Sequence, residues 1–155
     1  MPLRSEITDP REYNAALAVE FRANGGRVTG DFEGRPILLL VSTGARTGRP
    51  RVTPLLYTMD RDRFVVAAAN GGSVSHPAWY GNITTNPVVT IELGRESFPA
   101  LARVARGQER ERLFAERRMV MPRIQEYQDA AGRCIPFVLF RRASAHADEG
   151  SPGIV

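Results

Sequence analysis

Short apolar runs separated by polar turns make up most of the hydrophobic pattern of this chain. The runs predict strands at 37–41, 52–59, 64–69, 88–93 and 135–142, and a further strand is expected within 98–106. Several strands at short spacing, with few helices between them, are typical of an antiparallel barrel and not of a parallel α/β sheet. The pattern therefore predicts a mainly β fold of the α+β class, an antiparallel β-barrel of about six strands with peripheral helices.

Helical patterns flank the strands. The first is predicted at about 9–23, where Asp9 can cap the helix and Asn24 precedes two glycines that end it. Leu17 and Phe21 lie four residues apart on one face, which favours a helix packed on the barrel over a helix lying on a membrane. Further helices are expected at 76–85, 108–121 and 124–130.

The composition bounds the class of protein. With 155 residues, 43% of them apolar, the chain fits one domain, predicted at 1–142, and the small, polar stretch 143–155 is predicted to be a disordered tail. The chain contains no apolar run of about 18 residues and no apolar signal-peptide core. Its one cysteine, Cys134, excludes an intrachain disulfide and a cysteine zinc site, and favours a cytoplasmic protein without a metal ion.

The basic residues indicate the chemistry of the partner. The net charge is +4, and all 21 basic residues are arginines, whose guanidinium groups keep their charge and bind anions bidentately. This balance favours an anionic ligand or an anionic membrane surface. The sequence has no basic stripe with interleaved aromatic residues, so we expect no nucleic-acid partner.

The connection between the first two predicted strands carries the densest chemical signal. Arg46, Arg49 and Arg51 lie there among glycines and hydroxyl residues. Glycines let the backbone approach a ligand closely, and the planar forks of arginine match phosphate oxygens. We interpret the segment as a site for a phosphorylated small molecule, and the alternative is a solvated hairpin turn.

A second candidate segment follows the third predicted strand. Ala68 and Ala69 are small residues at a strand end, and Asn70 and Gly71 follow them. Such residues leave room for a flat ring against the backbone, with a plain loop as the alternative.

The next predicted helix opens with two further candidates. His76 is a candidate proton donor, and a helix cap or a packed residue is the alternative. Trp79 is a candidate to stack on a ligand, and a core position is the alternative. Each signal is weak alone, and their order along one short domain gives them weight.

Four stretches together resemble a known family. In order and spacing, the stretches 20–26, 38–55, 68–72 and 76–87 are similar to those of the deazaflavin-dependent nitroreductase family, and the resemblance extends over about 14–140. It implies a split β-barrel like that of flavin-mononucleotide-binding oxidases, with coenzyme F-420, a reduced 8-hydroxy-5-deazaflavin, as hydride donor. F-420 carries a phosphodiester and a polyglutamate tail, and its negative charge agrees with the arginine-rich connection.

The resemblance also implies cofactor contacts by position. Arg46 and Arg51 are expected to hold the phosphate, with the backbone of Thr47 and Gly48 beside it. Family members often carry lysine at the positions of Arg46 and Asn70, so that arginine keeps the charge and asparagine removes it. Together with the candidates above, the remaining expected cofactor-binding residues are Pro54, Leu55, Ala68, Ala69, Asn70, Gly71 and Trp79.

The substrate side departs from the best-known members, which activate nitroimidazole prodrugs and line their pocket with several tyrosines. In the matching stretch 121–127, only Tyr127 is retained. The resemblance implies a reductase that transfers a hydride from F-420 to a flat, electron-poor acceptor such as a quinone, an unsaturated lactone or a nitroaromatic. Tyr57, Tyr127 and water are the candidates for supplying the proton that must follow.

Two other functions stay open from the sequence. One is an oxidoreductase that uses flavin mononucleotide (FMN) on the same barrel, and the other is a non-catalytic F-420-binding protein. The sequence also leaves open whether the barrel pairs into a homodimer. A peripheral contact between the N-terminal helix and the inner face of the cell membrane is open as well.

Overall fold

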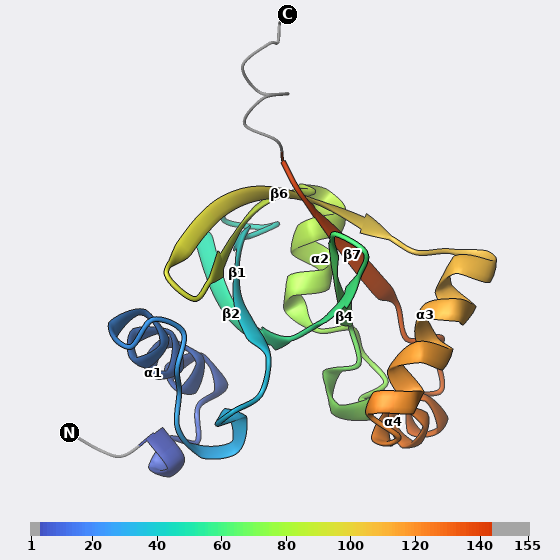
Figure 1. Ribbon diagram of the computed structural model, residues 1–155, viewed down its shortest axis with the longest axis horizontal. Helices are drawn as coiled ribbons and strands as arrows, with labels where there is room; N and C mark the ends of the chain where they lie inside the picture. Colours follow the sequence, from blue (N-terminus) through green and yellow to red (C-terminus); the bar gives the residue numbers. More distant parts are fainter. Residues whose placement is uncertain (1–3, 144–155) are drawn as a thin grey trace, which may run out of the picture.

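Seven strands form one antiparallel sheet in the computed structural model, which describes residues 4–143 (Figure 1). The order of the strands across the sheet is β2-β1-β5-β6-β7-β4-β3. In chain order they are β1 (Ile37–Thr43), β2 (Pro50–Leu56), β3 (Thr58–Asp60), β4 (Arg63–Ala67), β5 (Val88–Leu93), β6 (Glu96–Val104) and β7 (Phe137–Arg142). The predicted antiparallel, mainly β architecture is confirmed.

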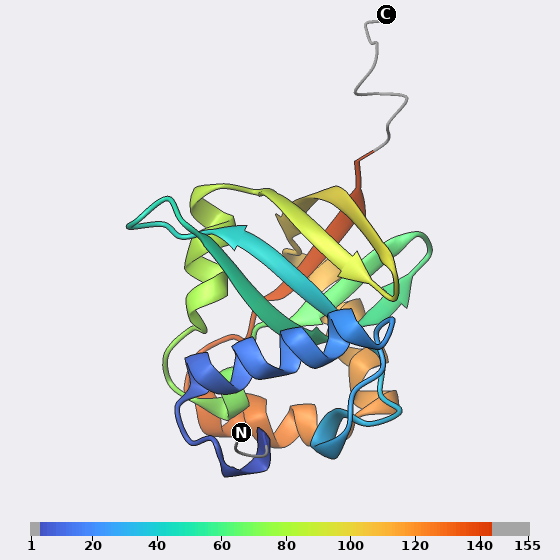
Figure 2. The ribbon, with the colours of Figure 1, turned by 90° about the vertical axis from the view of Figure 1, so that its left-hand side faces the viewer.

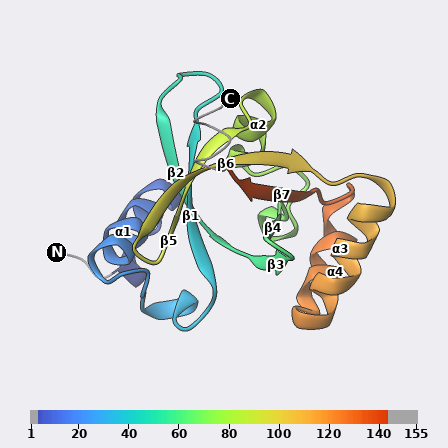
Figure 3. The same cartoon turned by 45° about the horizontal axis from the view of Figure 1, so that its top comes forward.

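The chain crosses from one edge of the sheet to the other at Tyr57. β2 and β3 are the two edge strands, yet only Tyr57 separates them in sequence, so the sheet curls on itself (Figures 1 and 3). The single strand predicted at 52–59 is therefore two strands, because a strand cannot keep its pairing partner while the chain crosses between edges. The sheet has seven strands instead of about six, and its curl gives the split barrel that the resemblance implied.

The two faces of β1 pack against different parts of the molecule. Leu38 and Leu40 lie inside the barrel in a cluster with Phe140, whereas Ile37 and Leu39 pack in a second cluster beside the first helix. Side chains alternate between the faces of a strand, so a continuous apolar run is needed where both faces are covered. Each fully buried leucine contributes roughly 1.5–3 kcal/mol to the free energy of unfolding.

Helices pack against both faces of the curled sheet, and one of them packs Trp79 and Ile83 against the cluster inside the barrel. Those of the described residues are α1 (Pro10–Ala23), α2 (Ala78–Thr85), α3 (Gly107–Val120) and α4 (Arg123–Ala131). α1 lies on the half that contains β1 and β2, and α3 and α4 lie on the half that contains β4 and β7 (Figure 1). Between residues 4 and 143, no helix is long and apolar enough to cross a membrane.

The first helix begins and ends as predicted. The Asp9 carboxylate accepts a hydrogen bond from the N–H of Arg11 (2.8 Å), and the chain leaves the helix through Gly26, whose N–H donates to the carbonyl of Phe21 (2.8 Å). Leu17 and Phe21 are 0% and 1% exposed. The apolar stripe of α1 is thus buried on the sheet, which confirms the interpretation as a helix packed on the barrel.

The predicted tail at 143–155 lies outside the described residues except for Ala143. The N–H of Ala143 donates to the carbonyl of Pro99 (2.9 Å), so the pairing of β7 with β6 continues to this residue. The end of the single domain at residue 142 remains a prediction.

Candidate cofactor site

The β1–β2 loop is a compact turn held by its own backbone. The Gly44 N–H donates to the Arg49 carbonyl (2.7 Å), and the Gly48 N–H donates to the Gly44 carbonyl (2.8 Å). Gly48 has a φ of 71°, a region that glycine enters without strain. Among the described residues, no acceptor meets the N–H groups of Arg46 and Thr47. These two groups, and not the N–H of Gly48, are therefore the backbone donors left for an anion.

Helix α2 anchors this loop. The Asn82 side chain accepts a hydrogen bond from the N–H of Ala45 (2.9 Å) and donates one to the Oγ of Ser42 (3.3 Å). Ser42 is 2% exposed, and a buried hydroxyl needs a partner. Figures 2 and 3 show the hairpin projecting beside α2. The amide of Asn82 thereby fixes the hairpin relative to the helix.

Within the described residues, the guanidinium groups of this hairpin have no acidic partner. Among the described residues, no ion pair involves Arg46, Arg49 or Arg51. Arg51 lies opposite Ser42 in the register of β1 and β2, so both side chains lie on the face of the hairpin that meets α2. A Cβ added to Gly44 would lie 3.4 Å from the Nε of Arg51, which shows that this side chain folds back along the turn.

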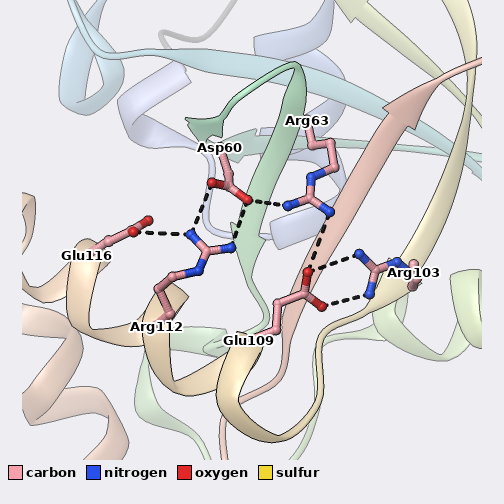
Figure 4. A network of polar contacts seen from close by, with 6 residues as sticks. All are labelled: Asp60, Arg63, Arg103, Glu109, Arg112 and Glu116. Carbon is pink, nitrogen blue, oxygen red and sulfur yellow. Dashed lines mark hydrogen bonds and ion pairs between the residues drawn. The ribbon is translucent and has the colours of Figure 1, made fainter.

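Arginines near α3 have carboxylate partners. Arg112 donates to both carboxylate oxygens of Asp60 at 3.1 Å, and Arg103 donates to those of Glu109 at 2.7 and 3.1 Å (Figure 4). Arg63 lies between the two carboxylates and pairs with both. Other exposed arginines, among them Arg61, Arg95 and Arg123, also form no ion pair with the described residues, so the hairpin is distinguished by having three such arginines together on one turn.

The second predicted segment begins with two buried alanines. Ala68 is 0% exposed and Ala69 is 8% exposed, and each packs in a different core cluster. The N–H of Ala68 donates to the carbonyl of Pro136 (2.8 Å), which continues the pairing of β4 with the segment before β7. Any contact of these alanines with a ligand would be made mainly by their backbone.

Left-handed residues follow the alanines and form a short turn, η3 (Asn70–Gly72). The φ values of Asn70, Gly71 and Gly72 are 49°, 63° and 84°. The Asn70 amide donates to the carbonyl of Ser75 (3.1 Å), so this side chain shapes the loop. A Cβ on Gly71 would meet no atom within 4 Å, whereas one on Gly72 would lie 3.2 Å from the Cα of Tyr127 on α4. The turn thus joins Tyr127 to the second segment and leaves the Gly71 backbone open to a ligand.

Other predicted site residues belong to the barrel core. Trp79 is 5% exposed and packs against Phe140, with ring centroids 6.3 Å apart. Tyr57 is half-buried and lies edge-on to Phe64 at 5.5 Å, and burial raises the pKa of its phenol. Tyr57 packs against the cluster inside the barrel, and Tyr127 packs against the cluster under α3 and α4. The two tyrosines therefore belong to different packing clusters.

Pro54 and Leu55 lie on opposite faces of β2. Leu55 is opposite Leu38, which points into the barrel, and Pro54 is opposite Leu39, which points toward α1. A ligand on one face of the strand can contact the side chain of only one of them.

Sequence reasoning missed two residues that shape the site. Asn82 fixes the hairpin, and Arg133 donates to the carbonyls of Ala68 (3.3 Å) and Ala69 (3.1 Å). Asn82 belongs to the stretch 76–87, so its position was within a recognised motif. No sequence signal marks Arg133, because its contacts join residues 57 to 65 positions apart.

A surface hollow of about 670 Å³ lies away from these segments, between the end of α1 and residues 27–35. None of the predicted site residues lines it. The free backbone donors lie at the hairpin and the open backbone of Gly71 lies at η3, so these two segments, and not the hollow, are the candidate site.

The fold and the donor-rich hairpin define a split-barrel protein suited to an anionic cofactor. The family model described as F420H(2)-dependent quinone reductase matches residues 15–141. The F420H(2)-dependent quinone reductase Rv1261c of Mycobacterium tuberculosis (strain ATCC 25618 / H37Rv) is 33% identical over 128 residues, which cover 79% of this chain and 85% of that protein. The chain belongs to the F420H(2)-dependent quinone reductase family.

Two solved structures resemble this chain in both sequence and fold. The structure described as F420-H2 dependent reductase (FDR-A) is 34% identical, with a TM-score of 0.63, and the match covers 69% of this chain and 95% of that chain. A structure described as a domain-swapped dimer is 30% identical, with a TM-score of 0.65, and covers 84% of this chain and 96% of that chain. The predicted enzyme class, an oxidoreductase, and the predicted cofactor, coenzyme F-420, are confirmed by the family.

The residues present fit this cofactor. A phosphodiester needs fixed cationic or N–H donors, and the hairpin offers three guanidinium groups and two N–H groups that no acceptor of the described residues meets. A flat ring needs exposed backbone beside small side chains, and the open Gly71 beside buried alanines provides it.

Proposed function

We propose that this chain transfers a hydride from reduced F-420 to a quinone, with the cofactor bound across the β1–β2 hairpin and the segment after β4. The observation that carries the proposal is the hairpin, where arginines that pair with no carboxylate of residues 4–143 surround a glycine turn that α2 holds in place. An exposed cation cluster without carboxylates favours an anionic ligand.

The hairpin is proposed to hold the phosphodiester. Arg46 and Arg51 would donate charge-assisted hydrogen bonds to its oxygens, beside the N–H groups of Arg46 and Thr47. The hydroxyl of Thr47 accepts from the N–H of Arg49 (3.2 Å) and keeps its own proton free to donate. These groups would bind and orient the cofactor without taking part in the transfer.

The segment after β4 is proposed to lie along the ring. Ala68 and Ala69 keep the backbone close to the barrel, and the left-handed turn at Asn70 and Gly71 exposes that backbone. When bound, reduced F-420 supplies the hydride, and the protein supplies position and electrostatics.

A quinone that gains a hydride also gains a proton to become a hydroquinone. The phenols of Tyr57 and Tyr127 are the proposed donors or substrate contacts. Because burial raises the pKa of Tyr57, this phenol stays protonated at neutral pH and can donate a hydrogen bond. A phenol that has donated its proton must regain one from water, and a half-buried phenol stays accessible to water.

The acceptor side favours a quinone over a nitroimidazole. Met121 and Tyr127 pack as partly buried residues on the cluster under α3 and α4, and Ile124 is fully buried. The tyrosine-rich lining of the prodrug-activating members is therefore reduced to Tyr127. An apolar wall with one phenol suits a flat, weakly polar ring.

We further propose that the chain pairs into a homodimer, as a relative described as a domain-swapped dimer does. Light scattering behind a sizing column would give twice the 17.1 kDa chain mass for a dimer, and the single mass would overturn it. No membrane contact is assigned to α1, since its apolar stripe packs on the sheet.

The test of the function is a fluorescence titration of the purified protein with F-420 and, in parallel, with FMN. We expect micromolar or tighter binding of F-420 alone, followed by oxidation of reduced F-420 when a quinone is added. Preference for FMN would overturn the cofactor assignment. Tight F-420 binding without turnover of quinone, lactone or nitroaromatic acceptors would identify a non-catalytic F-420-binding protein.

A further inference from the structure

One guanidinium group forms hydrogen bonds along the segment that follows β4. Arg133 lies in the connection between α4 and β7, and its side chain extends to this segment. Its contacts are to the carbonyls of Ser73 (3.1 Å), Ala68 (3.3 Å), Ala69 (3.1 Å) and Ser75 (3.1 Å), and to the Nδ1 of His76 (3.1 Å).

The segment needs such a partner because its backbone is irregular. Three consecutive left-handed residues turn the chain at η3, so its carbonyls leave the ladder of β4. Carbonyls without partners are costly when they are shielded from water. Arginine is the side chain with five N–H donors in a fixed fork, and here all three of its nitrogen atoms are used.

Arg133 is itself held in place. Gly132 ends α4 with a φ of 65°, and the Gln128 amide donates to the carbonyl of Arg133 (2.6 Å). The Oε1 of Gln128 accepts from the N–H of Ile135 (3.0 Å) and from Arg110 (2.7 Å), which is 7% exposed. A buried arginine of α3 therefore fixes the backbone from which Arg133 extends.

The contact with His76 selects a tautomer. A guanidinium group only donates hydrogen bonds, so the Nδ1 atom that faces it must be an acceptor. An imidazole that accepts this hydrogen bond at Nδ1 carries its ring proton on Nε2. The ring lies over Tyr80 with centroids 4.6 Å apart, and His76 is exposed, so the Nε2–H remains available as a donor.

We propose that Arg133 is a positioning residue of the F-420 site, which holds residues 68–76 in the conformation that receives the deazaflavin ring and holds His76 as an Nε2–H donor at the rim of that site. The inference rests on the proposed function, since residues 68–71 are the proposed ring contacts. His76 would thus present a hydrogen bond to an electron-rich atom of the cofactor or the acceptor.

The test compares Arg133→Met, Arg133→Lys and a control, Arg103→Met, in the full chain. Arg103 is likewise an arginine with paired nitrogens, but it belongs to the network around Glu109. Without cofactor, we measure amide hydrogen exchange and the ring ¹⁵N shifts of His76. With cofactor, we measure the Kd for F-420.

In Arg133→Met we expect exchange at residues 69–76 to rise at least about tenfold, with mixed tautomers at His76 and F-420 affinity reduced by about tenfold or more. Arg133→Lys should restore part of each effect, because an ammonium group offers three donors. Arg103→Met should leave all three readouts unchanged.

Unchanged exchange and an unchanged tautomer in Arg133→Met, with wild-type protein that binds F-420, would overturn the positioning role and leave the function standing. Wild-type protein that fails to bind F-420 would overturn the function itself. If Arg133→Met does not fold, the same readouts in Arg133→Lys decide, and unchanged values there overturn the inference.

Discussion

Arginines occur in two contrasting settings in this molecule, the β1–β2 hairpin and the network around α3. In the network, Arg112, Arg63 and Arg103 share the carboxylates of Asp60 and Glu109 (Figure 4). In the hairpin, no carboxylate of residues 4–143 pairs with any of the three arginines. The described part of the chain therefore supplies acceptors to the arginines of one region and supplies none to those of the other.

The difference separates two uses of charge. Paired guanidinium groups join β3, β4, β6 and α3 and contribute to the stability of the fold. Guanidinium groups without partners contribute little to stability, because they are solvated equally well in the unfolded chain. They are instead available to bind an anion. Substitutions in the two regions should therefore affect different measurements.

The largest expected effect is on cofactor affinity at the hairpin. Arg46→Ala and Arg51→Ala should each weaken F-420 binding by about 1.5–3 kcal/mol, because each removes a charge-assisted hydrogen bond to the phosphodiester. This corresponds to a loss of about 10- to 150-fold in Kd, measured by fluorescence titration. The free energy of unfolding should change by less than about 0.5 kcal/mol, since neither guanidinium group pairs with a described residue.

Arg103→Ala is the matched control for this prediction, because it removes the same charge from the network. It should leave the Kd for F-420 unchanged. Unchanged affinity in both hairpin variants would remove the phosphate assignment and with it the contrast between the two regions.

The second largest expected effect is in the network, where a substitution should lower the free energy of unfolding and leave F-420 affinity unchanged. Asp60 is 9% exposed and accepts from Arg112 and Arg63, so Asp60→Asn leaves two guanidinium groups without their carboxylate. We expect the free energy of unfolding to fall by about 1–2 kcal/mol in urea denaturation. The exposed Asp62 provides the control, Asp62→Asn, for which no change is expected. A weaker F-420 affinity in Asp60→Asn would show that the two regions are coupled.

Local patterns predicted most of the fold. The apolar runs and the capping signals of α1 depend on neighbouring residues, so strands and helices were recognisable. The break at Tyr57 was not, because nothing local distinguishes a strand from a chain that crosses between sheet edges. The pairing of Asp60 with Arg112 joins residues 52 positions apart and follows only from the folded arrangement.

At the candidate site, too, local patterns were predictable and contacts between distant residues were not. The hairpin arginines were predicted because the glycines, hydroxyls and cations of this site are adjacent in sequence. The opposite faces of Pro54 and Leu55 follow from strand periodicity once the register is known. The roles of Asn82 and Arg133 depend on helices that approach loops from elsewhere in the chain, and a single sequence does not specify such contacts.

The pH dependence of stability provides a smaller effect in the network. The hydrogen bonds from Arg112, followed by those from Arg63, lower the pKa of Asp60 from 3.8 to about 2. Because the folded-state pKa lies below the unfolded value, the stabilisation is complete above about pH 4 and is lost as the pH falls toward 2. Between pH 5 and pH 2, wild-type protein should lose about 1 kcal/mol more than Asp60→Asn, measured by urea denaturation at each pH. Parallel curves for the two proteins would contradict this.

The smallest effect concerns Asn82, which connects the hairpin to the body of the protein. Asn82→Ala leaves the Ser42 hydroxyl and the Ala45 N–H without their partner and should lower the free energy of unfolding by about 0.5–1 kcal/mol. F-420 affinity should fall several-fold, because the arginines then lose their fixed position.

Asn82→Asp separates position from charge at the same residue. The carboxylate can still accept from Ala45, so stability should fall less than in Asn82→Ala. The new negative charge lies beside the hairpin and competes with the phosphodiester for its guanidinium groups, so affinity should fall further. Opposite rankings of the two variants in stability and in affinity would show that the hairpin arginines act on the ligand. Identical rankings would mean that the hairpin, like the network, serves the fold.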